Sequence, residues 1–180
     1  MQEELKKSKL WILVGMPGSG KSYWIANHKN YFSGSCVSVS RDTIRFILVK
    51  EDEPYFSKEK QVFEKFIENI KVGLNYYDNT IADATHINPS SRGKLLRALG
   101  NSLKDIEINA IVIDTCLAKC LEQNAKREGR KVVPETAIRN MFSNFSMPTL
   151  EEGFDNIYIY TKVDDTITYR IIKKNNETKE

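Results

Sequence analysis

The chain has 180 residues, of which 41% are hydrophobic and 28% are charged, with 27 lysines and arginines against 24 aspartates and glutamates. This length and composition are typical of one globular domain, and they exclude a disordered, collagenous or coiled-coil chain. The net charge of +3 is too small to indicate nucleic-acid binding by itself, so any such surface must come from local clustering.

The predicted elements alternate between strands and helices along the chain. Strands are expected at 9–15, 36–40, 80–85, 106–113 and 156–161, with helices at about 20–30, 41–50, 57–76, from 89, after 114, and from 134 to about 145. Asp114 or Thr115 is expected to cap the helix that follows the fourth strand. The run at 166–172 should form an edge hairpin with the fifth strand around Asp164 and Asp165. This pattern predicts an α/β fold with a mainly parallel sheet of about five strands.

We expect one domain over residues 1–180, with polar ends at 1–8 and 173–180. Its three cysteines, Cys36, Cys116 and Cys120, are too few for a disulfide framework, which favours a reducing compartment. Cys116 and Cys120 could share a helix face as a metal pair, but they are better interpreted as small buried hydrophobes. Residues 1–8 do not resemble a signal peptide, and no apolar run reaches the roughly 18 residues of a membrane span. A cytoplasmic protein without a membrane partner is expected, and the sequence does not indicate an oligomeric state.

The strongest motif is GMPGSGKS at residues 15–22, which fits the phosphate-loop pattern G-x-x-x-x-G-K-S between a strand and a helix. Its glycines let backbone N–H groups surround phosphates, and the helix that begins here adds partial positive charge. Lys21 is placed to reach the β- and γ-phosphates, and the Ser22 hydroxyl to bind Mg²⁺. The residues expected to bind ATP are Gly15, Met16, Pro17, Gly18, Ser19, Gly20, Lys21, Ser22 and Tyr23.

A second pattern, TKVD at residues 161–164, resembles the guanine-reading motif of GTPases. No D-x-x-G accompanies it, so it is better interpreted as part of the edge hairpin. The chain is also short for a motor protein. A small kinase is therefore the leading class.

A kinase needs a base for the acceptor hydroxyl, a metal ligand and positive charge on the transferring phosphoryl group. The second strand runs directly into Arg41, Asp42 and Arg45. Because the carboxyl ends of parallel strands meet at the ligand crevice, Asp42 would point toward the γ-phosphate. Asp42 could equally be a helix N-cap, and its spacing does not decide between the two. Arg45, one turn later, could hold an anionic acceptor.

Two strands end in an apolar run followed by aspartate, at Asp83 and Asp114. The choice of metal ligand depends on which strand lies beside the phosphate-loop strand. Because Asp114 directly precedes a helix that it could cap, Asp83 is preferred. A basic cluster at 126–131 falls between two helices, where it is either a lid that brings an arginine over the phosphates or a solvated helix end.

Four blocks resemble the polynucleotide 5′-kinases of phage and animals, within the P-loop kinases. They are VGMPGSGKSYW, SRDTIR, IADATHINPSSR, and QNAKREGRKVVPE followed by PTLEEGFDNI, in the same order and at similar spacing over about residues 9–160. The resemblance implies a three-layer, adenylate-kinase-like P-loop NTPase fold. It also implies transfer of the ATP γ-phosphoryl group to the 5′-hydroxyl of DNA or RNA, with Mg²⁺, in nucleic acid repair.

The resemblance further implies roles for single residues. Asp42 matches the general base, Arg45 the arginine on the acceptor phosphate, and Arg127 best matches the lid arginine. The implied catalytic residues are Asp42, Lys21, Arg127 and Arg130; the implied substrate-binding residues are Arg41, Arg45, Asp83, Thr85 and Arg92; the implied metal ligands are Ser22 and Asp83. The turn at 83–89 and the lid are each one residue longer than in the phage enzyme, so Thr85 and the choice between Arg127 and Arg130 stay open. Tyr23 also departs from the threonine usual in the family.

Two other functions stay open at this point. The first is a P-loop kinase of a small molecule such as a nucleoside, sugar or antibiotic, and the second is an ATP-binding regulatory module. Aromatic residues such as Tyr55 could stack on a nucleobase, but they are better interpreted as packing residues. His86 is interpreted as a polar turn residue without a chemical role.

Overall fold

A six-stranded sheet forms the centre of the molecule, and its order is β2-β3-β1-β4-β5-β6. The structure, a computed structural model, describes residues 8–163 and 166–174. The strands are β1 (Lys9–Val14), β2 (Cys36–Ser40), β3 (Asn79–Asp83), β4 (Glu107–Asp114), β5 (Asn156–Val163) and β6 (Thr166–Lys173). All neighbouring pairs are parallel except β5 and β6, which pair antiparallel at the edge. The expected parallel sheet and edge hairpin are confirmed, although Asp164 and Asp165 lie outside the described residues.

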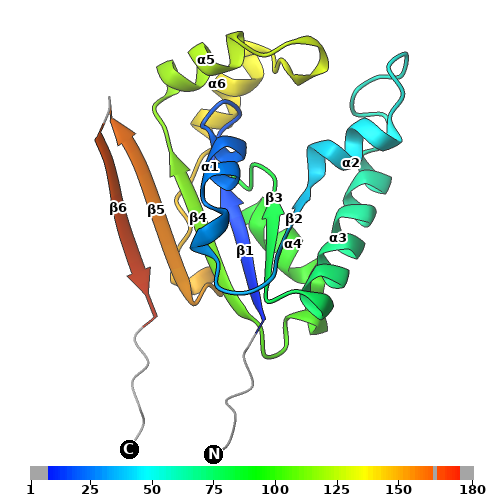
Figure 1. The fold of residues 1–180 in the computed structure, drawn as a ribbon. Coiled ribbons are helices and arrows are strands. Elements are labelled where there is room, and N and C mark those ends of the chain that lie inside the picture. The colour runs from blue at the N-terminus through cyan, green and yellow to red at the C-terminus, as the bar shows by residue number, and fades with distance from the viewer. Residues whose placement is uncertain (1–7, 164–165, 175–180) are drawn as a thin grey trace, which may run out of the picture.

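Helices connect the strands and cover both faces of the sheet (Figure 1). They are α1 (Lys21–Asn27), α2 (Arg41–Leu48), α3 (Glu59–Tyr76), α4 (Pro89–Leu99), α5 (Leu117–Ala125) and α6 (Glu135–Ser143). Short 3₁₀ turns lie at Lys29–Tyr31, Gly100–Leu103, Gly129–Lys131 and Leu150–Glu152. In Figure 1 the carboxyl ends of the parallel strands point to the top, where α5 and α6 lie on one side and α2 on the other.

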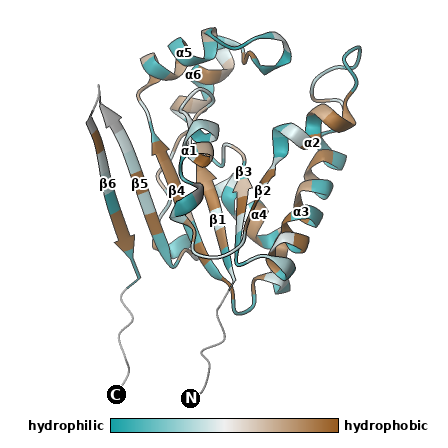
Figure 2. Cartoon of the chain, viewed as in Figure 1, coloured by the Kyte–Doolittle hydropathy of each residue, from teal (hydrophilic) through white to brown (hydrophobic). Residues whose placement is uncertain are grey.

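Strand β1 is buried on both faces, which explains its continuous apolar sequence. Leu10, Ile12 and Val14 belong to a core cluster with the inner sides of α3 and α4. Trp11 and Leu13 belong to a second cluster, on the opposite face, with residues of α1. The apolar character of the central strands is visible in Figure 2. The expected three-layer α/β fold is thereby confirmed.

The helix that follows β4 begins differently from the expectation. Cys116 is the cap residue of α5, and its side chain makes no capping hydrogen bond, so the expected cap by Asp114 or Thr115 is wrong. The physical reason is that β4 continues as far as Asp114, which pairs with Thr161 of β5. The Thr161 hydroxyl donates to the Asp114 carboxylate at 3.2 Å, and the Thr115 hydroxyl donates to the Ser19 carbonyl at 2.9 Å.

Among the helices of the described residues, we find none with the length and apolar character needed to span a bilayer.

Candidate active site

The phosphate loop joins β1 to α1 at the carboxyl edge of the sheet. Gly18 has a φ of +79°, and a Cβ atom on it would lie 2.3 Å from the carbonyl oxygen of Cys120 in α5. Only glycine therefore fits this close approach between the loop and α5. Gly20, with a φ of +97°, is the residue before α1 and sets the turn into that helix. This local geometry is the one that the GMPGSGKS pattern predicts.

Lys21 lies folded over this loop. Its Nζ atom donates to the carbonyls of Gly15 and Met16, each at 2.8 Å. Burial lowers the pKa of Lys21 to about 8, an effect that the positive charge of Arg127 reinforces and that the charges of Asp83 and Asp42 oppose. Lys21 therefore lies within electrostatic reach of Arg127, Asp83 and Asp42.

The other residues of the phosphate loop differ in their exposure to solvent. Met16, Pro17 and Ser19 are buried, whereas Ser22 and Tyr23 are exposed at the start of α1. The N–H of Gly15 donates to the Thr85 carbonyl at 2.9 Å, so the backbone of the 83–89 turn supports the loop. The Ser19 Oγ atom is buried and has no hydrogen-bond partner within the described residues.

Asp83 ends β3 and Asp114 ends β4, and β1 lies between these two strands. Position beside the phosphate-loop strand therefore does not choose between the two aspartates. Their surroundings differ, because Asp114 accepts from Thr161 of β5 whereas the charge of Asp83 acts on Lys21. Burial raises the pKa of Asp83, against the opposing charge of Lys21. Of the two aspartates, Asp83 is the one whose charge acts on the pKa of Lys21.

Helix α2 carries Asp42 and Arg45 beside this edge. Ser40, not Asp42, caps the helix, since the Ser40 Oγ accepts from the Thr43 N–H at 3.4 Å. Asp42 lies in the first turn, its side chain is 71% exposed, and its Oδ1 accepts from Arg45 Nη1 at 2.5 Å. Of the two roles left open by the sequence, the N-cap is therefore wrong, because Ser40 fills that position.

Glu59, the first residue of α3, holds two arginines of α2. Its Oε2 accepts from Arg41 Nη2 at 2.8 Å, and its Oε1 accepts from Arg45 Nε at 2.6 Å. Burial alone would raise the pKa of Glu59, but bonds and charges from Arg45 and Arg41 hold the pKa below its ordinary value. Sequence reasoning missed Glu59, because no local pattern links it to a site 14 residues earlier in the chain.

Arg127 and Arg130 have different neighbours. Arg127 follows α5, and its Nη1 atom donates to the Lys131 carbonyl at 3.4 Å. The positive charge of Arg127 also lowers the pKa of Lys21. Arg130 reaches across to α2, where its Nη1 donates to the Val49 carbonyl at 2.9 Å. The structure therefore separates two residues that the sequence treats as alternatives for one role.

The hydrogen bonds of Arg92 go to other residues than those described so far. Its side chain is fully buried on α4, and its five N–H donors meet protein acceptors. Glu152 accepts at 2.7 and 2.8 Å, and the carbonyls of His86, Ser146 and Met147 accept the others at 3.0, 3.0 and 3.5 Å. The geometry gives Arg92 a structural position, so we leave it out of the site that we propose.

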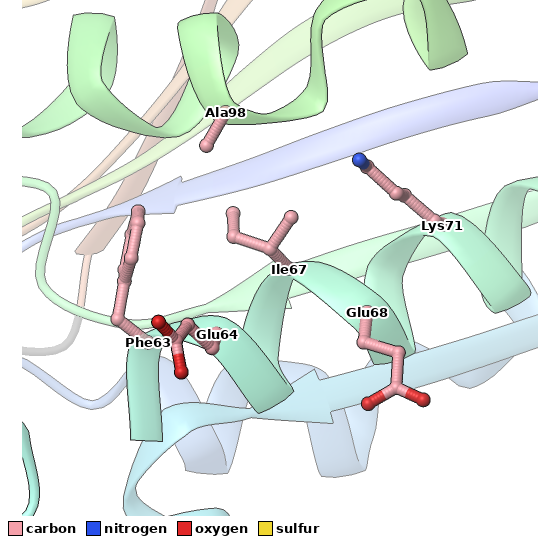
Figure 3. Close-up of a pocket in the computed structure, with 6 residues that line it drawn as sticks. All are labelled: Phe63, Glu64, Ile67, Glu68, Lys71 and Ala98. Atoms are coloured by element: carbon pink, nitrogen blue, oxygen red, sulfur yellow. The ribbon is translucent and has the colours of Figure 1, made fainter. Parts of the chain in front are cut away.

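A shallow groove with a volume of about 350 Å³ lies between α3 and α4 (Figure 3). It is lined by Phe63, Glu64, Ile67, Glu68, Lys71 and Ala98. Its two glutamates would repel a phosphate backbone, and none of the phosphate-loop residues lines it. The groove is therefore not part of the candidate site.

The residues that could hold a metal are oxygen donors at the phosphate loop. The described residues contain no group of three or more His, Cys, Asp or Glu side chains arranged for a metal ion. Mg²⁺ does not require one, because it is usually bound by one or two protein oxygens together with phosphate oxygens and water. The exposed Ser22 hydroxyl and the Asp83 carboxylate are donors of this kind. The site chemistry therefore fits a nucleotide-bound Mg²⁺.

Several solved structures share this fold. A chain of the Pnkp1/Rnl/Hen1 RNA repair complex is 26% identical, with a TM-score of 0.54 over 77% of this chain and 44% of that one. The present chain thus spans less than half of that protein. Kti12 of Chaetomium thermophilum, in complex with ADP-AlF3, has a TM-score of 0.64 at 15% identity over 87% of this chain and 90% of its own. A sugar kinase from Janibacter sp. has a TM-score of 0.58 at 10% identity over 86% and 85% of the two chains.

The last two likenesses, at low identity, show the fold alone. The parallel sheet, the phosphate loop and the matched family model together give a P-loop NTPase fold. The expected resemblance to P-loop polynucleotide kinase-like proteins is confirmed at the level of family and fold, with an RNA repair protein among the relatives. Residues 10–148 match a family described as the AAA domain. Because this match covers most of the 180 residues, the chain belongs to the AAA domain family.

Proposed function

We propose that the protein is an ATP- and Mg²⁺-dependent kinase that transfers the γ-phosphoryl group of ATP to the 5′-hydroxyl end of DNA or RNA. The observation that carries this proposal is the pairing of Asp42 with Arg45 at the carboxyl edge of the sheet, within electrostatic reach of Lys21. An exposed carboxylate beside a held arginine is what a base needs next to an anionic acceptor.

In the proposed reaction, the Asp42 carboxylate accepts the proton of the acceptor hydroxyl. The hydroxyl oxygen forms a bond to the γ-phosphorus, the bond from that phosphorus to the β,γ-bridging oxygen breaks, and ADP leaves. Lys21 binds the β- and γ-phosphates, and Arg127 stabilises charge on the transferring group. Ser22 and Asp83 are the residues that would hold Mg²⁺, which would neutralise phosphate charge when bound. The protein thus acts mainly by positioning and electrostatics.

The acceptor side favours a nucleic acid end over a small neutral molecule. Arg41 and Arg45 are both held by Glu59, so α2 carries two cations of fixed orientation on either side of Asp42 in the sequence. Arginine held in a fixed plane is suited to bidentate contact with a phosphate group. The 26% identity to a chain of an RNA repair complex supports the same choice and a role in RNA repair.

The test uses the protein with ATP, Mg²⁺ and matched 5′-hydroxyl DNA and RNA oligonucleotides, with products weighed by mass spectrometry. We expect one phosphate gained at the 5′ end. In Asp42→Asn the rate should fall by about 10²- to 10⁴-fold while ATP binding is kept. The matched control is Asp105→Asn, an exposed aspartate at a positive φ that asparagine tolerates.

Two outcomes would contradict the proposal. Unchanged turnover in Asp42→Asn would refute Asp42 as the base. ATP turnover without a phosphorylated oligonucleotide would favour a non-kinase module, or a small-molecule kinase if a metabolite screen then yields a phosphorylated product.

A further inference from the structure

The segment between α5 and α6, residues 126–133, is here called the lid. It makes a long-range contact with the acceptor side of the site through Arg130. The Arg130 Nη1 atom donates to the carbonyl of Val49, the residue that ends α2, 81 positions earlier. A cation at the last carbonyls of a helix also interacts favourably with the helix dipole. The lid is therefore attached to α2 by a hydrogen bond and by the attraction between the arginine charge and the helix dipole.

The Arg130 guanidinium also lies against two aromatic rings. Its central carbon is 5.5 Å from the ring centre of Tyr55 and 5.8 Å from that of Phe46. The two rings contact each other edge to face, with centres 6.1 Å apart. Arginine over an aromatic face is attracted by the ring quadrupole, and its flat shape makes this stacking specific. The lid thus has a defined seat on the acceptor side.

Tyr55 connects this seat to the residues of the proposed reaction. The Arg45 guanidinium carbon is 4.8 Å from the Tyr55 ring centre, and Arg45 Nη1 donates to the Tyr55 hydroxyl at 3.2 Å. The same hydroxyl donates to Asp42 Oδ1 at 3.5 Å. One tyrosine therefore contacts the lid arginine, the acceptor arginine and the proposed base.

We propose that Arg130 is a latch that seats the lid on Tyr55 and α2, and that through Tyr55 the closed lid positions Asp42 and Arg45 for the acceptor. In this arrangement Arg130 is a positioning residue, and Arg127 is the lid arginine on the phosphate side. The inference deepens the proposed function and rests on it for the roles of Asp42 and Arg45. The seating of the lid does not depend on which molecule is phosphorylated.

The first experiment measures amide hydrogen exchange of the lid in the free protein. In Arg130→Ala we expect lid amides to exchange about tenfold faster, because the lid loses its seat. The control is Arg139→Ala, which removes the same charge from an exposed arginine that pairs with Glu135 on its own helix. Arg130→Lys keeps a donor for the Val49 carbonyl but lacks the planar group. The lid amides of this variant should therefore exchange faster than those of the wild type and more slowly than those of Arg130→Ala.

Substitutions of Tyr55 separate the ring from the hydroxyl. Tyr55→Phe keeps the ring, so lid exchange should stay as in the wild type while the acceptor KM rises about tenfold. Tyr55→Ala should accelerate lid exchange as Arg130→Ala does. The double variant Arg130→Ala/Tyr55→Ala should exchange no faster than Arg130→Ala, because Arg130→Ala already removes the contact with Tyr55.

Steady-state kinetics then link the latch to the reaction. Arg130→Ala should raise the acceptor KM about tenfold and leave the ATP KM unchanged, whereas Arg127→Ala should lower kcat about 10²-fold. Unchanged lid exchange in Arg130→Ala would overturn the latch, whatever the protein phosphorylates. Faster exchange without oligonucleotide phosphorylation would leave the latch standing and refute the proposed function instead. If the effects of Arg130→Ala and Tyr55→Ala on the acceptor KM were additive, Arg130 would not act on the acceptor side through Tyr55.

Discussion

The guanidinium of Arg45 donates a hydrogen bond of 2.5 Å to the carboxylate of Asp42, one helical turn earlier on α2. Arg45 is buried and Asp42 is exposed, so the arginine is the fixed partner and orients the carboxylate. Two further groups, Glu59 and Tyr55, hold the arginine from the other elements around it. The proposed base is therefore oriented by a network and not by its own backbone position.

Glu59→Gln should weaken the acceptor side without affecting nucleotide binding. The substitution removes the charge that pairs with Arg41 and Arg45, and both arginines would lose their fixed orientation. We expect the KM for a 5′-hydroxyl oligonucleotide to rise about tenfold and the ATP Kd to stay the same. Glu64→Gln, exposed on the same helix, is the control. An equal loss of ATP affinity would show that Glu59 acts on the whole site.

ATP binding should weaken as pH rises above about 8. Burial is the main cause that lowers the pKa of Lys21 to this value, and only the protonated amine attracts phosphate. Bound phosphate favours the protonated form of Lys21, so above pH 8 the binding of ATP is accompanied by the uptake of a proton. The Kd for ATP should therefore rise by at most about tenfold per pH unit. Calorimetric titrations in buffers of different ionisation enthalpy measure this uptake. Lys21→Met should bind ATP weakly, and its Kd should not depend on pH in this way. If the pH dependence persisted in this variant, a group other than Lys21 would be its cause.

The folded protein should lose stability in mild acid because of His86. Burial is the main cause that lowers its pKa to about 4, while the bond to the Leu13 carbonyl opposes the shift. The ordinary pKa is 6.5, so between pH 6.5 and 4 the unfolded chain binds more protons, and stability falls as pH falls. The loss from this group should be on the order of 3 kcal/mol. His86→Asn, which suits the φ of +42°, should show a flatter pH profile in urea unfolding, and equal slopes would contradict the assignment.

Breaking the buried pair of Arg92 and Glu152 should destabilise the fold. Glu152→Gln leaves the Arg92 charge buried without its counter-ion, which typically costs about 3–5 kcal/mol. Chemical denaturation measures this loss, with the exposed Glu151→Gln as control. Arg92→Lys, which cannot satisfy the same five acceptors, should also lower stability. If it instead raised only the acceptor KM, Arg92 would be a substrate-binding residue, as the resemblance implies.

The sequence by itself determined the elements and the phosphate loop. Apolar periodicity, a proline in the first turn of α4 and the glycines of the loop act over a few neighbouring residues, so local patterns predict the elements that they form. The order SRDTIR also placed Asp42 at the end of a strand, where parallel sheets bind ligands. The expected cap of α5 failed because pairing with β5 extended β4, and that pairing joins residues 47 positions apart.

Only the tertiary structure decided which side chains meet. It placed β1 between β3 and β4, which removed strand position as a reason to choose Asp83 over Asp114. It brought Glu59 to the arginines of α2, and Arg130 to Tyr55 and Val49. These contacts join surfaces of separate elements after the chain has folded, and no local repeat or propensity encodes them. A long side chain such as arginine can reach several acceptors, so its partner is selected by the packing around it.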